Sequence, residues 1–223
     1  MMHAVSFNPA KRFRSPSGFS LIEILTVIAI MAILLVAAIP VLSNTSSNAR
    51  QASREIIKAH LQQARAQAIS SGNATALAIP VLGTGKALGA RALTLFEVEY
   101  DGSNYVAMTD PDTGQQAMLQ RWQELPGNFH FVTAADIGGS DTTIMDSASR
   151  LETNFKGENI SCHMIVFAPN GQIVRPADEV NIVIAQAVKQ GSGLRLTDKN
   201  GSEPIYELFQ VNRLTGRTRP IRR

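Results

Sequence analysis

The sequence predicts an α+β protein, in which a long N-terminal helix, transmembrane in its first part, packs on an antiparallel β-rich head. Two observations support this class. An apolar run that starts at Phe19 is followed by a second stretch with helical periodicity, which together reach about Ser71. After Asn73 the pattern changes to short segments rich in β-branched and aromatic residues, with turn residues between them.

The apolar run from Phe19 to Ile39 is interrupted only by Ser20, Glu23 and Thr26. A helix of this length spans roughly 30 Å, the thickness of a bilayer core. A carboxylate at that depth costs on the order of 2.5–3.5 kcal/mol, so Glu23 suggests a partner charge. A proteolytic cut after Gly18 would create such a charge, the free amine of Phe19.

The helix is expected to be kinked or locally melted after this run, because Pro40 is followed by the polar segment 43–48. Helical periodicity then resumes in one apolar stripe, formed by Ile57, Leu61, Ala64 and Ala68. Gly72 suits the end of the helix. We therefore expect one helix over 19–72, with residues 19–39 in the membrane or in a filament core.

The head is expected to comprise residues 73–223. Asp101-Gly102 and Asn170-Gly171 are its strongest turn signals. Segments dominated by Gly, Ser, Thr and Asp predict loops at Pro80–Gly89, Asp110–Gln116 and Asp136–Ser149. Strands are predicted at Thr75–Ile79, Ala92–Tyr100, Tyr105–Met108, Phe129–Thr133, Ile160–Ala168, Gln172–Arg175, Val180–Val188 and Ile205–Asn212.

The leader, residues 1–18, carries Lys11, Arg12 and Arg14 and no acid. Positive charge stays on the cytoplasmic side, which predicts that the head lies outside the cytoplasm. The chain has 21 Lys and Arg against 18 Asp and Glu, so without the leader it is neutral overall. Cys162 is the single cysteine, which excludes an intrachain disulfide.

The segment Ser17-Gly18-Phe19-Ser20-Leu21-Ile22-Glu23 resembles the type IV prepilin class, which includes the pseudopilins of type II secretion. An ordinary signal peptide has a shorter, acid-free core. The resemblance implies cleavage between Gly18 and Phe19 by a prepilin peptidase, methylation of the Phe19 amine, and a role for Glu23 in filament register. It also implies a pilin-like fold in a single-pass protein of the inner membrane.

The partners implied by this resemblance are other pilins or pseudopilins and an inner-membrane assembly platform. After assembly, the filament would lie in the periplasm or at the cell surface. The resemblance implies a structural subunit and not an enzyme.

A second resemblance points to one branch of that class. Segments 49–56, 61–69, 165–171 and 215–217 are similar to the minor pilins and pseudopilins typified by GspH and FimT, whose head is two β-sheets packed on the helix. Major pilins usually have a disulfide-closed loop, which one cysteine excludes, or a calcium loop. Calcium needs six or more oxygens, and Asp110 and Asp112 do not provide them. We expect no metal and no cofactor.

The C-terminal tail is basic. In an extended segment Arg217 and Arg219 project to the same side and could clamp a phosphate. Gly216-Arg217-Thr218-Arg219 resembles the C-terminal DNA-binding motif of FimT-type minor pilins. A solvated tail, anionic lipid and acids on a neighbouring subunit are the alternatives. The remaining tail arginines are Arg213, Arg222 and Arg223.

Catalytic motifs are absent from the sequence: it contains no His-Glu-x-x-His, Gly-x-Ser-x-Gly or Cys-x-x-Cys. Three hypotheses therefore remain at this point. The chain is a structural subunit of a pilus or pseudopilus, a DNA-binding minor pilin for uptake, or an anchored periplasmic enzyme with pilin-like targeting. The sequence predicts no catalytic residues, which argues against the third.

Overall fold

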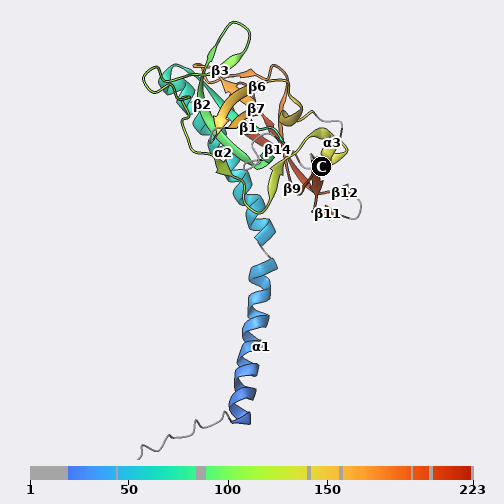
Figure 1. Cartoon of the computed structure of the whole chain (residues 1–223). Coiled ribbons are helices and arrows are strands. Elements are labelled where there is room, and N and C mark those ends of the chain that lie inside the picture. The colour runs from blue at the N-terminus through green and yellow to red at the C-terminus, as the bar shows by residue number, and fades with distance from the viewer. Residues whose placement is uncertain are drawn as a thin grey trace, which may run out of the picture. The chain divides into compact units, whose positions relative to one another are not determined.

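The structure is a computed structural model. It describes residues 20–43, 45–83, 89–139, 142–155, 158–191, 193–200 and 203–221, apart from the side chains of 35–46 and 155. The chain divides into two compact units, the first ending at Asn44 and the second beginning at Thr45 (Figure 1). Each unit is described in turn.

The first unit contains α1, Leu21–Ser43. The carbonyl oxygen of Ser20 accepts hydrogen bonds from the amides of Glu23 (3.0 Å) and Ile24 (3.2 Å), which makes Ser20 the residue that starts the helix. The interruption predicted near Pro40 is not found at that residue, because α1 includes Pro40 and continues to Ser43. A proline removes one hydrogen bond and crowds the preceding turn, but the backbone after it can stay helical.

The second unit is the head, which begins with α2, Thr45–Ser71. As the sequence predicts, Gly72 follows the helix with a positive φ of 73°, and its amide donates to the carbonyl of Ala68 at 3.2 Å. The predicted stripe is buried, with Ile57, Leu61, Ala64 and Ala68 at most 1% exposed. This stripe packs the helix onto the strands (Figure 1).

Two antiparallel sheets form most of the head. The large sheet has the order β3-β2-β1-β7-β6, with β4 paired to β2 and β8 to β7. The two outermost strands of that order, β3 and β6, also lie close together, so the sheet is strongly curled. Its strands are β1 Ala74–Pro80, β2 Ala92–Tyr100, β3 Tyr105–Ala107, β4 Gln123–Glu124, β6 Arg150–Phe155, β7 Glu158–Phe167 and β8 Ile173–Arg175.

The small sheet has the order β10-β9-β13-β14, and β5 also pairs with β9. A two-stranded hairpin, β11 Lys199–Asn200 and β12 Glu203–Pro204, and two short helices, α3 Ala134–Ile137 and η2 Ile144–Asp146, complete the described elements together with η1 Gly89–Arg91. The strands of the small sheet are β5 Phe129–Phe131, β9 Val180–Gln190, β10 Gly193–Leu196, β13 Tyr206–Val211 and β14 Thr218–Ile221.

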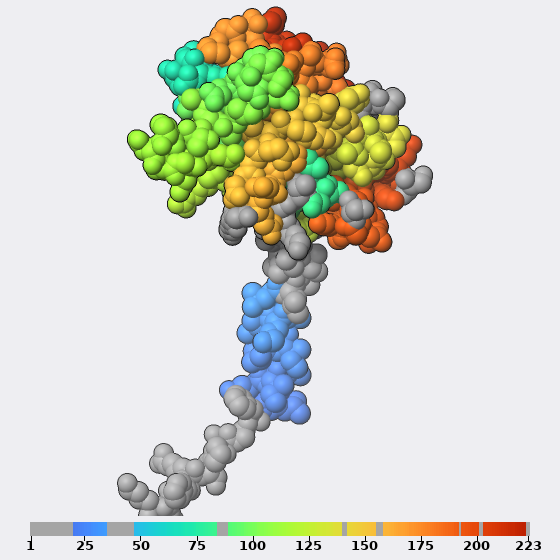
Figure 2. Space-filling model, turned by 45° about the horizontal axis from the view of Figure 1, so that its top comes forward, coloured from blue at the N-terminus to red at the C-terminus, as the bar shows by residue number. Residues whose placement is uncertain are grey.

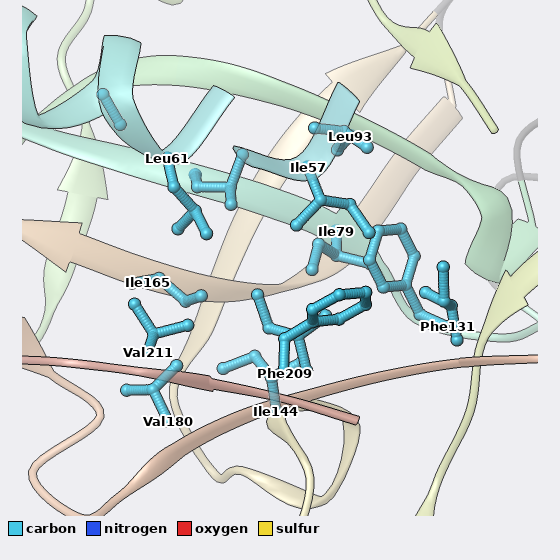
Figure 3. Packing of buried hydrophobic residues seen from close by; sticks show 14 of the residues in the cluster. Ile57, Leu61, Ile79, Leu93, Phe131, Ile144, Ile165, Val180, Phe209 and Val211 are labelled. Carbon is cyan, nitrogen blue, oxygen red and sulfur yellow. The ribbon is translucent and has the colours of Figure 1, made fainter. Parts of the chain in front are cut away.

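The main core lies where α2 and the inner faces of both sheets meet. Figure 3 shows Ile57 and Leu61 of α2 close to large-sheet residues such as Ile79 and Ile165, with Phe209 of the small sheet beside them. Alternate residues on the other faces form two further clusters, one within the curled large sheet and one on the outer face of the small sheet. The head thus has a core on both faces of each sheet.

Gln116 closes the curl of the large sheet. Its amide nitrogen donates to the carbonyl of Glu152 at 3.3 Å, and its amide oxygen accepts from the backbone of Asn154 at 3.1 Å and from the Thr153 hydroxyl. Figure 2 shows the green segment around residues 100–117 lying beside the gold β6 strand. One side chain therefore joins two edges that are far apart in strand order.

All eight predicted strands overlap observed ones, and β2 has the predicted bounds. The predicted loop Asp110–Gln116 contains no strand. The predicted loop Asp136–Ser149 is wrong in part, because it includes the end of α3 and all of η2, each started by a threonine–aspartate capping box. Part of the Pro80–Gly89 loop, residues 84–88, lies outside the described residues. The sequence did not predict β4, β6, β10, β11, β12 or β14.

Candidate functional site

The surface of α1 is apolar on every side. Its large side chains from Leu21 to Leu34 are between 48% and 81% exposed within the chain. A helix that is hydrophobic all round needs an apolar environment, either lipid or other helices. Glu23 is exposed in the first turn of this surface, whereas Thr26 satisfies its hydroxyl within the helix by donating to the Ile22 carbonyl at 2.7 Å.

Within the residues that the structure describes, no helix meets the combined length and hydropathy requirement for a membrane span. The predicted span, 19–39, lies partly outside the described side chains, which stop at residue 34 and resume at 47. Gly18 and Phe19, the residues of the predicted cleavage and methylation site, also lie outside the described residues, as does the leader.

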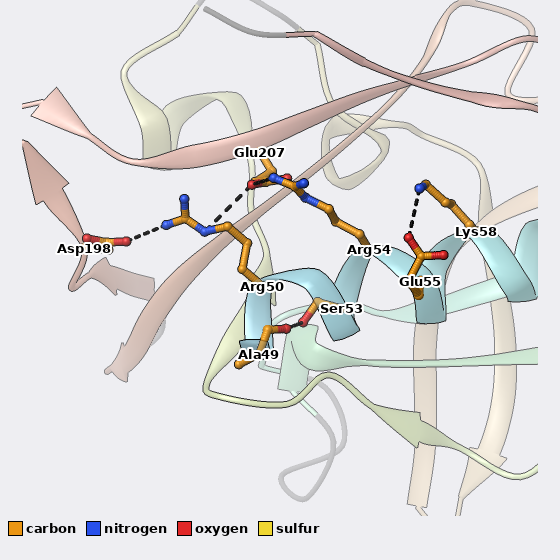
Figure 4. A network of polar contacts seen from close by, with 8 residues as sticks. All are labelled: Ala49, Arg50, Ser53, Arg54, Glu55, Lys58, Asp198 and Glu207. Carbon is orange, nitrogen blue, oxygen red and sulfur yellow. Dashed lines mark hydrogen bonds and ion pairs between the residues drawn. The ribbon is translucent and has the colours of Figure 1, made fainter. Parts of the chain in front are cut away.

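Two arginines one turn apart hold the first turns of α2 to the small sheet (Figure 4). Arg54 donates two hydrogen bonds to the Glu207 carboxylate on β13, and this contact raises the pKa of Arg54. Arg50 lies 2.7 Å from Asp198 and 3.7 Å from Glu207. The Glu207 side chain is only 10% exposed. These arginines are therefore structural, in a helix region that precedes the apolar stripe.

Three of the tail arginines lie around a hollow at the edge of the small sheet. Arg213, Arg217 and Arg219 line it, together with Glu179 and Gln210, and its volume is about 380 Å³. Arg219 is opposite Gln210 in the pairing of β14 with β13, and Arg217 is two residues earlier on the same side. Both guanidinium groups are exposed, and no ion pair to another described residue engages either.

Arg213 has a different role from its neighbours. Its guanidinium donates to the carbonyls of Ala177 and Ile173, the latter at 3.3 Å, and so ties the turn after β13 to β8 and to the segment that follows β8. Arg222 and Arg223 lie outside the described residues. Of the three tail arginines that the structure describes, Arg217 and Arg219 are the two whose guanidinium groups make no hydrogen bond or ion pair with another described residue.

Two glycine turns meet on the last turns of α2. The Arg65 Nε donates to the Gly171 carbonyl at 3.1 Å, and a Cβ built on Gly216 would lie 3.3 Å from the Arg65 Cδ and 3.0 Å from the Phe167 ring. Both glycines have positive φ. Segments 61–69, 165–171 and 215–217, three of the four that carry the GspH and FimT resemblance, therefore pack against one another.

Comparison with known proteins gives a match at the N-terminus. A family model described as the prokaryotic N-terminal methylation motif matches residues 13–39. The N-terminal segment of the chain is therefore type IV prepilin-like. The motif implies processing by a prepilin peptidase, anchoring in the membrane and assembly with other pilins, and it indicates a structural subunit rather than an enzyme. No curated protein and no solved structure matches the chain.

Burial shifts the pKa values of one cysteine and three histidines in the head. Burial raises the pKa of the Cys162 thiol to about 12, and burial together with Arg150 lowers the pKa of His163 to about 4. Burial also lowers the pKa values of His60 and His130. Among the described residues, no group of three His, Cys, Asp or Glu could hold a metal ion. Asp110 instead accepts from the backbone of its own turn, at 2.9 Å from the Asp112 amide.

The sequence did not predict that Gln210 and Glu179 line the hollow. It also did not predict that Arg50 and Arg54 form ion pairs with acids of the head. Gln210 could have been found, because it alternates with the apolar Phe209 and Val211 and must face away from the core. The acids that pair with the arginines of α2 could not have been found from the sequence. Asp198 is 148 residues further along the chain than Arg50, and Glu207 is 153 residues further along than Arg54.

Proposed function

We propose that this chain is a minor pilin or pseudopilin of the GspH and FimT type, assembled into a type IV pilus or a type II secretion pseudopilus. The observation that carries the proposal is the methylation motif on a helix whose apolar side chains are exposed on every side. A head of two antiparallel sheets packed on the second helix supports the branch.

In this role the leader is cut between Gly18 and Phe19, and the new Phe19 amine is methylated. The protein is first a single-pass protein of the inner membrane, with its head outside the cytoplasm. Its α1 then leaves lipid for a filament core, exchanging one apolar environment for another. An unpaired Glu23 carboxylate in that core would cost several kcal/mol, so the acid favours one register, in which a neighbouring amine neutralises it.

The cleavage step is tested in cells that contain a prepilin peptidase. Gly18→Glu should leave the leader attached, and the wild-type chain should start with methylated Phe19 by mass spectrometry. A Gly18→Glu chain cut to the mature size would refute the cleavage site.

The assembly step is tested by Glu23→Val. This variant should be inserted and cleaved but excluded from sheared filaments or cross-linked pilin complexes. Thr26→Val is the matched control, because the Thr26 hydroxyl is satisfied inside its own helix. Incorporation of Glu23→Val at the level of Thr26→Val would rule out the role in register.

A second candidate function is DNA binding by the head during uptake. The observation that favours it is the pair of exposed guanidinium groups of Arg217 and Arg219 on one hollow. Arginine suits phosphate because its fork donates two parallel hydrogen bonds. Glu179 also lines the hollow, and its carboxylate repels an anion. The attraction of phosphate to the two arginines must therefore exceed this repulsion.

DNA binding is measured with the processed full-length chain in nonionic detergent, as a function of salt. Arg217→Ala/Arg219→Ala should weaken binding and reduce the salt slope by about two. Arg121→Ala/Arg195→Ala removes the same amount of charge at two other exposed arginines, and it should change both the DNA affinity and the salt slope little. Equal effects of the two double variants would exclude a specific clamp.

A further inference from the structure

The arginine pair is part of a wider polar surface on the outer face of the small sheet. Gln210 on β13 is opposite Arg219 on β14, and on its other side it is opposite Asn181 on β9. Phe209 and Ile182, the neighbours of these residues along the strands, face the main core instead. Side chains directly opposite in an antiparallel pair are about 4.5–5.5 Å apart at Cβ. The register therefore groups a guanidinium and two amides.

Gln210 is the member of this group that combines access with free hydrogen-bonding capacity. Its side chain is partly exposed and lines the same hollow as Arg217 and Arg219. Within the described part of the chain, no hydrogen bond engages its amide, which offers two donors and an acceptor. A charged fork holds phosphate whatever the sequence, whereas an amide matches the donor and acceptor pattern of a base edge.

Asn181 provides an independent sign that this surface is incompletely paired. Its amide nitrogen donates to the Thr142 carbonyl at 3.2 Å, but its Oδ1 is buried and has no hydrogen-bond partner among the described residues. Buried acceptors are nearly always satisfied. The Gln210 amide is opposite it, so a donor from Gln210 to Asn181 would also fix the direction in which Gln210 presents its carbonyl.

We propose that Gln210 is a base-contacting residue of a nucleic-acid site in which Arg217 and Arg219 hold the phosphates and Glu179 limits the affinity. This inference rests on the second proposed function, DNA binding. It assigns the site two kinds of contact, one that depends on charge and one that depends on the bases. A strand of DNA would lie over the β13–β14 edge with its backbone on the arginines.

The two kinds of contact separate in a binding experiment with the processed full-length chain in nonionic detergent. The probes are a fluorescent single-stranded oligonucleotide of mixed sequence and inorganic polyphosphate, which carries charge without bases. Gln210→Ala should weaken oligonucleotide binding at least about fivefold with an unchanged salt slope, and should leave polyphosphate binding as it was. Gln210→Glu, which is nearly the same shape, should weaken the oligonucleotide further.

Two controls accompany these variants. Gln115→Ala changes an exposed glutamine at another hollow and should have no effect on either probe. Glu179→Gln removes the negative charge that repels anions, and it should increase the affinity for both probes about twofold or more. Unchanged melting temperatures of the Gln210 variants would show that any loss of binding is not a loss of folding.

The outcomes that overturn the inference are distinct from one another. If the wild-type chain binds DNA through the arginines but Gln210→Ala binds as tightly, the base contact is wrong and the phosphate clamp stands. Equal losses on both probes would make Gln210 a part of a charge-only site and also reject the base contact. If the wild-type chain binds no DNA at low salt, the DNA function fails together with this inference, and the assembly role is unaffected.

Discussion

Gly127 packs directly against Ala49, so that a Cβ added at Gly127 would lie 2.4 Å from the Cβ of Ala49. Gly127 precedes β5, and Ala49 is in the second turn of α2. The Ser53 side chain is buried, and its hydroxyl donates to the Ala49 carbonyl at 2.8 Å. This close contact and the arginine pairs place the first turns of α2, where the chain offers few large apolar side chains.

Gly127→Ala should therefore destabilise the head strongly. The φ of 64° at Gly127 costs an alanine roughly 1–2 kcal/mol, and the clash with Ala49 adds about 1–3 kcal/mol because a Cβ cannot move without its backbone. Gly138→Ala is the matched control, since Gly138 also has a φ of 64° but faces open space. Urea unfolding of the full-length chain in nonionic detergent measures both.

The contact itself is tested by compensation. Ala49→Gly makes room for the new methyl group at a helix cost of about 1 kcal/mol. The double variant should be more stable than Gly127→Ala alone. Additive losses in the double variant would mean that the two residues do not interact, and the close packing would then not explain the effect.

The sequence predicted the parts of the fold that local patterns encode. The stripe from Ile57 to Ala68 and the strands on either side of the main core are runs in which apolar residues follow the helical or strand period. Glu23 and its apolar helix were recognisable for the same reason. These features depend on neighbouring residues, so they are visible without a structure.

What the sequence did not predict depends on distant partners. β6 contains only two apolar residues, Leu151 and Phe155, and β14 contains Pro220, so neither is a clear strand until its pairing with β7 or β13 is known. Gln116 looked like part of a loop, although its side chain joins the edges of the large sheet. At the candidate site, the common side of Arg217 and Arg219 follows from strand period, whereas their proximity to Gln210 follows from register.

The Arg54–Glu207 pair should stabilise the start of α2. Glu207→Ala removes a largely buried carboxylate that pairs with the guanidinium groups of Arg50 and Arg54. We therefore expect the free energy of unfolding to fall by about 2 kcal/mol. Amide hydrogen exchange should increase in the first turns of α2 more than around Leu61. Glu55→Ala breaks the exposed pair with Lys58, which is worth at most about 0.5 kcal/mol. Similar effects of the two substitutions would contradict a special role for Glu207.

Cys162 should be unreactive in the folded head. It is fully buried on β7, and burial raises its pKa to about 12, so almost no thiolate exists at neutral pH. An aromatic disulfide reagent should leave the native chain unmodified for hours and modify it in urea, with a midpoint equal to that of unfolding seen by circular dichroism. Rapid modification of the native chain would show that the interior of the large sheet opens without global unfolding.

Gln116→Ala should loosen the closure of the large sheet. The variant leaves the Thr153 hydroxyl and the Glu152 carbonyl without their hydrogen-bond partner. We expect the free energy of unfolding to fall by about 1–3 kcal/mol. Gln115→Ala, next to it in the same turn, is the control because its side chain is exposed. Hydrogen exchange should increase at β6 in the first variant alone. Equal protection of β6 in both variants would show that pairing with β7 is enough to hold this edge.

The stability of the head should fall as the pH decreases from about 6.5 to about 4. His163 is 2% exposed, and its Nδ1 accepts a hydrogen bond from Arg150, so protonation would place a cation in the core facing a guanidinium. Burial and Arg150 lower its folded-state pKa to about 4, whereas the unfolded chain takes up the proton near 6.5. The unfolded state therefore binds more protons in this window, and stability is lost as the pH falls, by up to about 3 kcal/mol.

His163→Gln identifies the residue responsible, because glutamine can still accept from Arg150 but does not titrate. The free energy of unfolding of this variant, measured in urea at several pH values, should depend less on pH between 6.5 and 4 than that of the wild-type chain. His60→Gln should remove a smaller part of the dependence, since the Nδ1 of His60 donates to the Ile56 carbonyl, which favours the protonated ring. If His163→Gln keeps the full pH dependence, another group causes it and the buried His163 is not the source.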